Sequence, residues 1–390
     1  MITVDEALDH LFSLVSPLET ETVPLSEGMG RVLAADAVAT RDQPPFSASA
    51  MDGYAVAEAQ AAPGACFTVI GEAAAGHAFS GSVGARQAVR IFTGAPVPDG
   101  ADRVIIQEDV TRDGDRITLG ENLDNNKHIR PLGADFKVGD KLSAPRRLSA
   151  SDIALLASMN IPNVTVTRQP DIALISTGDE LVMPGETPGP DQIIASNTFG
   201  LKALLEAHGA RARILPIARD TRASLEAAFA LAEGADLVVT IGGASVGDHD
   251  LVGDVAADLG VERAFYKVKM RPGKPLMAGR FGEAAMVGLP GNPVSAMVCG
   301  HVFLLPMLRA MLGLGARRSS RLTARLAADI GPNGPREHYM RAIVKDGAIT
   351  PLPSQDSALL TVLAEANALM IRPPDDPPRE AGSQIPYLPL

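Results

Sequence analysis

The chain has 390 residues, of which 46% are hydrophobic and 21% charged, and it carries a formal net charge of −11. This length exceeds one ordinary core and predicts roughly two to four domains. The negative charge excludes general binding to nucleic acid or acidic membranes, so any phosphate contact requires a local basic patch.

The amino-terminal segment predicts a helix rather than an export signal. Residues 3–16 alternate apolar and polar positions at helical spacing, and Thr3 and Glu6 have the spacing of a capping box. Because this start is acidic, we expect a cytoplasmic protein. Two cysteines, Cys66 and Cys299, match no metal or redox spacing, which fits a reducing compartment.

A β-rich insertion is predicted next. Pro44 and Pro45 are incompatible with a continuing helix and set a boundary near residue 45. From residue 46 to 143, short β-branched runs are separated by glycine and aspartate turns, a pattern typical of small β domains.

Helical periodicity returns after the insertion. In SASDIALLASMN, Ser151 is a candidate helix cap. We expect residues 146–168 to pack back onto the amino-terminal helix, so that residues 1–45 and 144–169 form one discontinuous helical and linker domain.

Residues 170–316 predict an open parallel α/β domain. The strand-like segments DIALIST, RARILPIA and DLVVTIGG alternate with the helical segments SNTFGLKALLEAHG and TRASLEAAFALAEG. Two more strands, AFYKVKM and AAMVGL, precede a helix at GNPVSAM, where Asn292 can cap and Pro293 suits the first turn.

The most apolar run, from Val294 to Leu308, is short for a bilayer and is interrupted by Gly300, His301 and Pro306. It predicts a buried core helix, and we expect no membrane span. Beyond it, residues 317–390 contain short strands punctuated by proline and glycine, which predict a small β-barrel domain.

Ligands of open parallel sheets lie beyond the carboxyl ends of the strands, and three segments there carry candidate chemistry that should converge. The first, TGDEL, places Asp179 and Glu180 where a strand ends, a location suited to a hard cation. A helix-capping turn explains this segment equally well.

The second segment, GGASVGDHD, follows DLVVTI. Glycines Gly242, Gly243 and Gly247 let backbone amides approach a phosphate beside Ser245, and a carboxylate, from Asp248 or Asp250, can hold magnesium against it. A tight turn without function explains the glycines better than it explains the clustered acids.

The third segment, from Arg263 to Arg280, has six basic residues and no acidic one. Lys267, Lys269 and Arg271 have the spacing of side chains on one strand face, and Lys274 extends the patch, which could attract an oxyanion. An edge strand protected by lysines explains Lys267 and Lys269 about as well. The helix start at GNPVS, with Ser295, is either another anion site or a well-capped core helix.

These segments and three earlier motifs together resemble the molybdenum insertase family, the bacterial MoeA proteins and the E domain of gephyrin. The earlier motifs are SAMDGYAV with Asp52, IFTGAPVPDGAD with Thr93, and IRPLGADFKVGD with Arg130 and Asp135. The resemblance extends in order over essentially the whole chain.

The resemblance implies an elongated, four-domain homodimer with a MogA-like α/β domain, whose cleft lies between that domain and the insertion domain of the partner. It also implies the reaction, in which adenylylated molybdopterin receives molybdate, AMP leaves and molybdenum cofactor results. The molybdopterin adenylyltransferase and molybdoenzymes or cofactor-maturation proteins are the implied partners.

The resemblance also implies residue roles. Glu180 and Asp250 look like the magnesium ligands that help to cleave the phosphoanhydride, and Asp220 looks like another acid of the pterin pocket. The oxyanion pocket that accepts molybdate looks to be formed by Arg271, Lys274, Ser295, Arg336 and Ser357. The groups that the partner subunit contributes to the cleft look like Asp52, Thr93, Arg130 and Asp135.

Two departures from the family pattern affect these roles. Arg271 stands where the family often has lysine, which preserves charge but changes geometry. QDSALLT replaces the usual SGxLxS pattern around Ser357. An adenylyltransferase-like enzyme and a non-catalytic scaffold like gephyrin remain alternatives.

Overall fold

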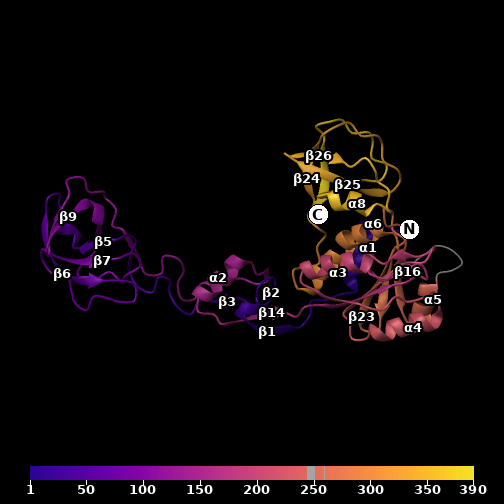
Figure 1. Cartoon of the computed structure of the whole chain (residues 1–390), viewed down its shortest axis with the longest axis horizontal. Coiled ribbons are helices and arrows are strands. Elements are labelled where there is room, and N and C mark those ends of the chain that lie inside the picture. The colour runs from indigo at the N-terminus through magenta and orange to yellow at the C-terminus, as the bar shows by residue number, and fades with distance from the viewer. Residues whose placement is uncertain (244–250, 259) are drawn as a thin grey trace.

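The computed structural model describes residues 1–243, 251–258 and 260–390, and it shows an elongated molecule (Figure 1). The β-rich insertion lies at one end, a small domain lies in the middle, and the α/β domain with the carboxyl-terminal barrel forms the other end. This arrangement confirms the predicted multidomain α/β class. Ser245, Gly247, Asp248 and Asp250 lie outside the described residues.

The middle domain is built from two distant parts of the chain. Its antiparallel sheet has the order β1 (Thr20–Pro24), β14 (Asn163–Thr167), β2 (Val32–Leu33), β13 (Arg146–Arg147). The shorter pair β3 (Ala37–Val38) and β12 (Lys141–Leu142) lies beside it, and α2 (Ala150–Ser158) covers the sheet. The predicted cap was two residues late: Ser149 caps α2, in a capping box with Asp152.

Helix α1 (Val4–Ser13) begins with the predicted capping box of Thr3 and Glu6. The expected packing of residues 146–168 on this helix is wrong. The buried face of α1, which includes Leu8 and Leu11, joins the core of the α/β domain, while α2 and β14 pack on β1 and β2. The apolar face of a helix can pack on any apolar surface, and the core of the α/β domain offers a larger apolar surface than the core of the middle domain does.

The insertion is a six-stranded sheet of order β8-β5-β7-β6-β10-β9. Its strands are β5 (Gly53–Val56), β6 (Cys66–Ala73), β7 (Gln87–Ile91), β8 (Arg103–Ile106), β9 (Val110–Asp113) and β10 (Arg116–Leu119). At its base, β4 (Ala48–Ser49) pairs with β11 (Ile129–Arg130).

The α/β domain has the sheet order β18-β15-β19-β23-β22-β20. Four predicted strands are parallel, namely β15 (Asp171–Ser176), β18 (Arg211–Ile214), β19 (Leu237–Ile241) and β23 (Ala284–Leu289). The edge is antiparallel, because β22 (Met277–Phe281), which the sequence analysis did not predict, pairs with β23 and with β20 (Glu262–Tyr266).

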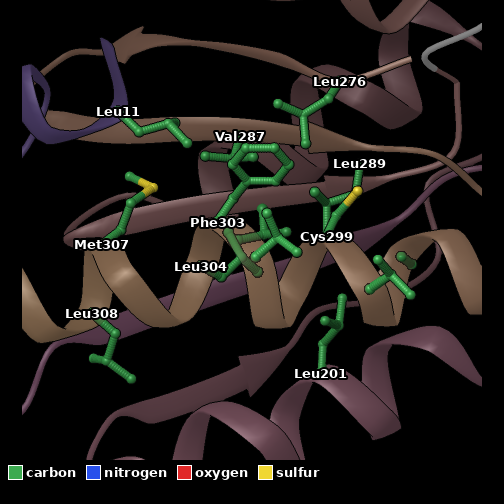
Figure 2. Packing of buried hydrophobic residues seen from close by; sticks show 14 of the residues in the cluster. Leu11, Leu201, Leu276, Val287, Leu289, Cys299, Phe303, Leu304, Met307 and Leu308 are labelled. Atoms are coloured by element: carbon green, nitrogen blue, oxygen red, sulfur yellow. The ribbon is translucent and has the colours of Figure 1, made fainter. Parts of the chain in front are cut away.

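Helices cover both faces of this sheet. One face packs on α3 (Asn197–Ala207), α6 (Pro293–Cys299) and α7 (Leu305–Met311), and the other on α4 (Arg222–Leu231) and α5 (Leu251–Asp258). Figure 2 shows Leu11, Leu201, Val287, Phe303 and Met307 packed together between α1, the sheet and the helices. Although the run Pro293–Met311 is long and apolar enough to cross a bilayer, most of it is buried, as predicted for a core helix.

The carboxyl-terminal region is a closed five-stranded barrel, which confirms the prediction. Its order is β25-β26-β24-β28-β27, closed by pairing of β27 with β25. The strands are β24 (Leu322–Leu326), β25 (Glu337–Lys345), β26 (Ala348–Pro351), β27 (Ala368–Arg372) and β28 (Gln384–Pro389), and a short helix α8 (Leu360–Glu365) precedes β27. Strand β21 (Met270–Arg271) leaves the α/β domain to pair with β25, so the two domains are joined through a shared sheet.

Candidate functional site

Three segments meet at the carboxyl end of the α/β sheet. The N–H of Thr177 donates to the carbonyl of Ile241 (3.0 Å), and the N–H of Gly242 donates to that of Leu289 (3.1 Å). A Cβ on Gly242 would lie 2.6 Å from the carbonyl oxygen of Thr177, and a Cβ on Gly291 would lie 3.3 Å from the Cα of Gly242. TGDEL, the first two glycines of GGASVGDHD and the turn before α6 therefore converge. The prediction placed the basic segment from Arg263 to Arg280 at this junction instead of the turn, but Arg271 and Lys274 of that segment line a separate cavity.

Glu180 lies at this junction. Its carboxylate folds back against the Cα of Gly178, in space that a side chain on residue 178 would occupy. It lines a small cavity of about 80 Å³, together with Thr177, Asn197 and Pro293. The hydroxyl of Thr177 is buried and has no hydrogen-bond partner among the described residues. A cavity lined by both a carboxylate residue and a residue with an unpaired hydroxyl is suited to a hard cation or a polar ligand group.

Asp220 lies on the next loop. Its N–H donates to Oδ1 of Asp179 (3.2 Å), and Nη1 of Arg219 donates to the carbonyls of Asp179 (2.9 Å) and Leu181 (3.1 Å). These bonds fix the loop after β18 against TGDEL. Within residues 1–243, 251–258 and 260–390, no three His, Cys, Asp or Glu side chains are close enough to hold a metal, and the second predicted ligand, Asp250, is not described.

A second, basic cavity of about 600 Å³ lies between the α/β domain and the barrel. All five residues predicted for the oxyanion pocket line it, namely Arg271, Lys274, Ser295, Arg336 and Ser357. Asp356 is the acidic residue among its lining residues, and it is outnumbered by three cations. The structure therefore collects these side chains from four separate segments, although their roles remain predictions.

The path of the chain explains this collection. Strand β21, which contains the start of the RPGKP segment, pairs with β25, so that Arg271 lies opposite His338. Gly273, at φ +106°, lies against the sulfur of Cys299 in α6, where a Cβ would approach to 2.6 Å. The N–H of Val294 donates to the carbonyl of Ser357 (3.1 Å), which ties the QDSALLT segment to the start of α6.

The predicted shared strand face for Lys267, Lys269 and Arg271 is wrong. Lys267 adopts a left-handed backbone conformation, with φ +72°, directly after β20 ends at Tyr266. This reversal breaks the alternation of side chains, and the strand resumes only at Met270 in the barrel sheet. Asn292 occupies the predicted cap position of α6, but its side chain makes no capping hydrogen bond.

The environment of His338 shows how positive this region is. Burial, followed by the charges of Arg271, Arg341, Arg336 and Arg372, lowers the pKa of His338 to about 4. Neither His338 nor Arg341 was among the residues predicted for the site. Both lie within residues 317–390, which were predicted only as a small β-barrel domain, and no local pattern shows that these two basic residues are buried beside the cavity.

The remaining predicted residues lie on the insertion. The carboxylate of Asp52 accepts hydrogen bonds from the N–H (2.7 Å) and the hydroxyl (2.8 Å) of Thr93, and these bonds lower its pKa. Arg130 is exposed opposite Ala48, and exposed Asp135 donates its N–H to the carbonyl of Gln43 (2.9 Å). Within one chain, the insertion lies at the opposite end of the molecule from the α/β domain (Figure 1).

Comparison with known proteins gives a consistent result along the chain. Residues 2–160 match the model described as "MoeA N-terminal region (domain I and II)", residues 173–310 match "Probable molybdopterin binding domain", and residues 323–390 match "MoeA C-terminal region (domain IV)".

Similar proteins include molybdopterin molybdenumtransferases from two bacteria. The one from Haemophilus influenzae is 38% identical over 317 residues, covering 80% of this chain and 78% of that protein. The one from Nostoc is 34% identical over 393 residues, covering 96% and 90% respectively. The crystal structure of the molybdopterin biosynthesis moeA protein from Pyrococcus horikoshii matches all of both chains, with a TM-score of 0.85 at 27% identity.

Proposed function

Because the chain belongs to the MoeA family, we propose that it is a molybdopterin molybdenumtransferase that inserts molybdate into adenylylated molybdopterin, with magnesium-dependent release of AMP. Relatives that carry the name molybdopterin molybdenumtransferase align with 80% and 96% of the chain. An enzyme of molybdenum cofactor biosynthesis that carries out this reaction must bring together two anionic substrates that repel each other.

One observation supports this function most strongly. Pro293 lines the cavity that contains Glu180, and Ser295, two residues further along α6, lines the basic cavity. The start of one helix therefore separates an acidic site from a basic site. Such a division lets a metal-associated pyrophosphate and a free oxyanion occupy adjacent positions, because each meets side chains of the opposite charge sign.

The residues of the two sites have different roles. Arg271, Lys274 and Arg336 bind molybdate and orient it by charge-assisted hydrogen bonds, and Ser295 and Ser357 supply hydroxyl donors. Glu180, together with Asp250, would hold the magnesium ion. When bound there, magnesium neutralises charge on the phosphoanhydride. Gly242 and Gly243 let the chain approach the pterin phosphate closely, and Asp220 lines the same edge.

We also propose that the active unit is a homodimer. The separation of the insertion from the α/β domain supports this, since Asp52 and Thr93 cannot reach Glu180 of their own chain in this conformation (Figure 1). A partner that lies alongside would bring its Asp52, Thr93, Arg130 and Asp135 to the cleft. In the cytoplasm, a molybdopterin adenylyltransferase would supply the substrate, and molybdoenzymes or their maturation proteins would accept the product.

The direct test uses the purified protein with adenylylated molybdopterin, molybdate and magnesium chloride. AMP is measured by chromatography, and molybdenum bound to the pterin by mass spectrometry. We expect AMP and molybdenum-pterin in equal amounts, and loss of both when magnesium is chelated. AMP formation at the same rate with and without molybdate would contradict the proposal. Turnover of molybdopterin with ATP would instead indicate an adenylyltransferase, and peptide capture without AMP release a scaffold.

A further inference from the structure

Arg341 is a buried cation that forms no ion pair with a carboxylate among the described residues. It lies in the middle of β25, and its relative exposure is 0%. Its Nη2 donates to the backbone carbonyl of Asp356 (3.0 Å), while Nε and Nη1 have no hydrogen-bond partner in the described part of the chain. None of the ion pairs found among the described residues includes Arg341.

Such a group is costly to bury. A guanidinium removed from water loses its hydration, and only a counter-charge or a full set of hydrogen bonds compensates for that loss. Burial, followed by repulsion from Arg271, lowers the pKa of Arg341, and Asp356 opposes this effect. The protein itself therefore leaves a buried positive charge incompletely matched.

Arg372 provides a comparison within the same barrel. It is also fully buried, with a relative exposure of 1%, on the strand paired with β25. However, it forms an ion pair with the buried carboxylate of Asp376 and donates further hydrogen bonds to three backbone carbonyls, those of Gly331 (3.2 Å), Asp376 (3.5 Å) and Pro377 (2.8 Å). A buried arginine in this barrel can thus be neutralised internally, whereas Arg341 is not.

The position of Arg341 indicates what could neutralise it. Its backbone N–H donates to Oε1 of Gln355 (2.9 Å), and its carbonyl accepts from Nε2 of Gln355 (2.9 Å). Gln355 and Asp356, both bonded to Arg341, line the basic cavity, as does Arg271. Arg341 thus lies directly behind one wall of the cavity rather than on its surface.

We propose that Arg341 is a positioning residue for the oxyanion substrate: it fixes the Gln355–Ser357 wall and supplies a buried positive charge that is matched only when a dianion occupies the basic cavity. This inference rests on the proposed function, because that function places molybdate in this cavity. The energy lost by burying Arg341 without a counter-charge is recovered on binding, so the anion stabilises the folded protein more than surface cations alone would allow.

The test compares thermal unfolding of the full-length protein with and without sodium molybdate. The variants are Arg341→Met, which keeps the shape of the stem, and Arg341→Lys, which keeps a charge but loses the planar donors. Arg325→Met, at an exposed position of β24, is the matched control for charge removal. Lys274→Ala, on the cavity surface, reports on the cavity itself.

We expect Arg341→Met to unfold, without molybdate, at a temperature equal to or above that of the wild type, because it removes an unmatched charge. Its stabilisation by molybdate should disappear, with affinity weakened at least about tenfold, and Arg341→Lys should retain part of it. Arg325→Met should respond as the wild type does. A purely structural arginine would instead lower stability in the absence of molybdate.

The outcomes separate this inference from the proposed function. If the wild type is stabilised by molybdate, Lys274→Ala is not, and Arg341→Met responds fully, the cavity binds molybdate but the inference about Arg341 is wrong. If the wild type shows no stabilisation at any molybdate concentration, both the cavity assignment and the inference are overturned. Lower stability of Arg341→Met without molybdate, with an unchanged molybdate response, also overturns it.

Discussion

Substitution of Gly242 by alanine probes the point where the three strand-end segments meet. Gly242 has φ +97°, and a Cβ there would lie 2.6 Å from the carbonyl oxygen of Thr177 and 3.0 Å from its Oγ1. Ordinary contact begins at 3.4 Å, so the carbonyl must retreat by about 0.8 Å. The backbone conformation costs about 1–2 kcal/mol and the forced displacement about 1–3 kcal/mol, which gives a loss of about 2–5 kcal/mol.

Gly347 is the matched control. It also has a left-handed conformation, with φ +76°, but a Cβ there would meet no atom within 4 Å. Gly347→Ala should therefore cost only the conformational part, about 1–2 kcal/mol. Urea unfolding followed by circular dichroism measures both losses, and the difference between the two variants isolates the clash with Thr177.

The clash should also affect substrate binding. Because Thr177 precedes Gly178 and Glu180, its displacement moves the TGDEL segment, and KM for adenylylated molybdopterin should rise at least about tenfold in Gly242→Ala alone. Equal stability losses in the two variants, together with an unchanged KM, would refute the convergence of these segments in the working enzyme.

Two further predictions concern the barrel and the dimer. The folded protein holds the pKa of His338 at about 4, below its ordinary value of 6.5, so below pH 6.5 the unfolded chain binds a proton that the folded chain does not. Stability should therefore fall with acidification from pH 6.5 toward pH 4, by about 2 kcal/mol at pH 5. His338→Gln should lose this part of the slope in urea unfolding, and an unchanged slope would contradict the assignment. For the dimer, at a magnesium concentration just sufficient for the wild type, Asp52→Asn and Glu180→Gln should each release little AMP alone, whereas a mixture allowed to exchange subunits should recover about a quarter of wild-type activity. No recovery in a mixture with demonstrated exchange would place both residues in a site made by one chain.

Much of the α/β domain could be predicted from local patterns. Strands such as β15 and β19 are continuous apolar runs, and they alternate with helices in a way that permits few arrangements. The motifs at the strand ends are equally local, which is why Glu180, Lys274 and Ser295 could be named before their positions were known.

Features that depend on distant packing could not be predicted. Helix α1 has a legible cap and apolar face, but nothing in its sequence distinguishes the α/β core from the middle domain as its partner. The reversal at Lys267 depends on how β20 ends and β21 joins the barrel. The burial of Arg341 follows from barrel closure and from docking of the 355–357 segment, so its sequence neighbourhood resembles that of any exposed arginine.

The central claim is that an acidic site and a basic site, separated by the start of α6, act on different substrates. The most direct measurement is AMP release by Glu180→Gln and Lys274→Ala while magnesium and molybdate are titrated independently. Glu180→Gln should need more magnesium and show the wild-type molybdate dependence. Lys274→Ala should show the reverse, with KM for molybdate raised at least about tenfold. If both variants shifted the same titration, the proposed division of the cleft would be contradicted.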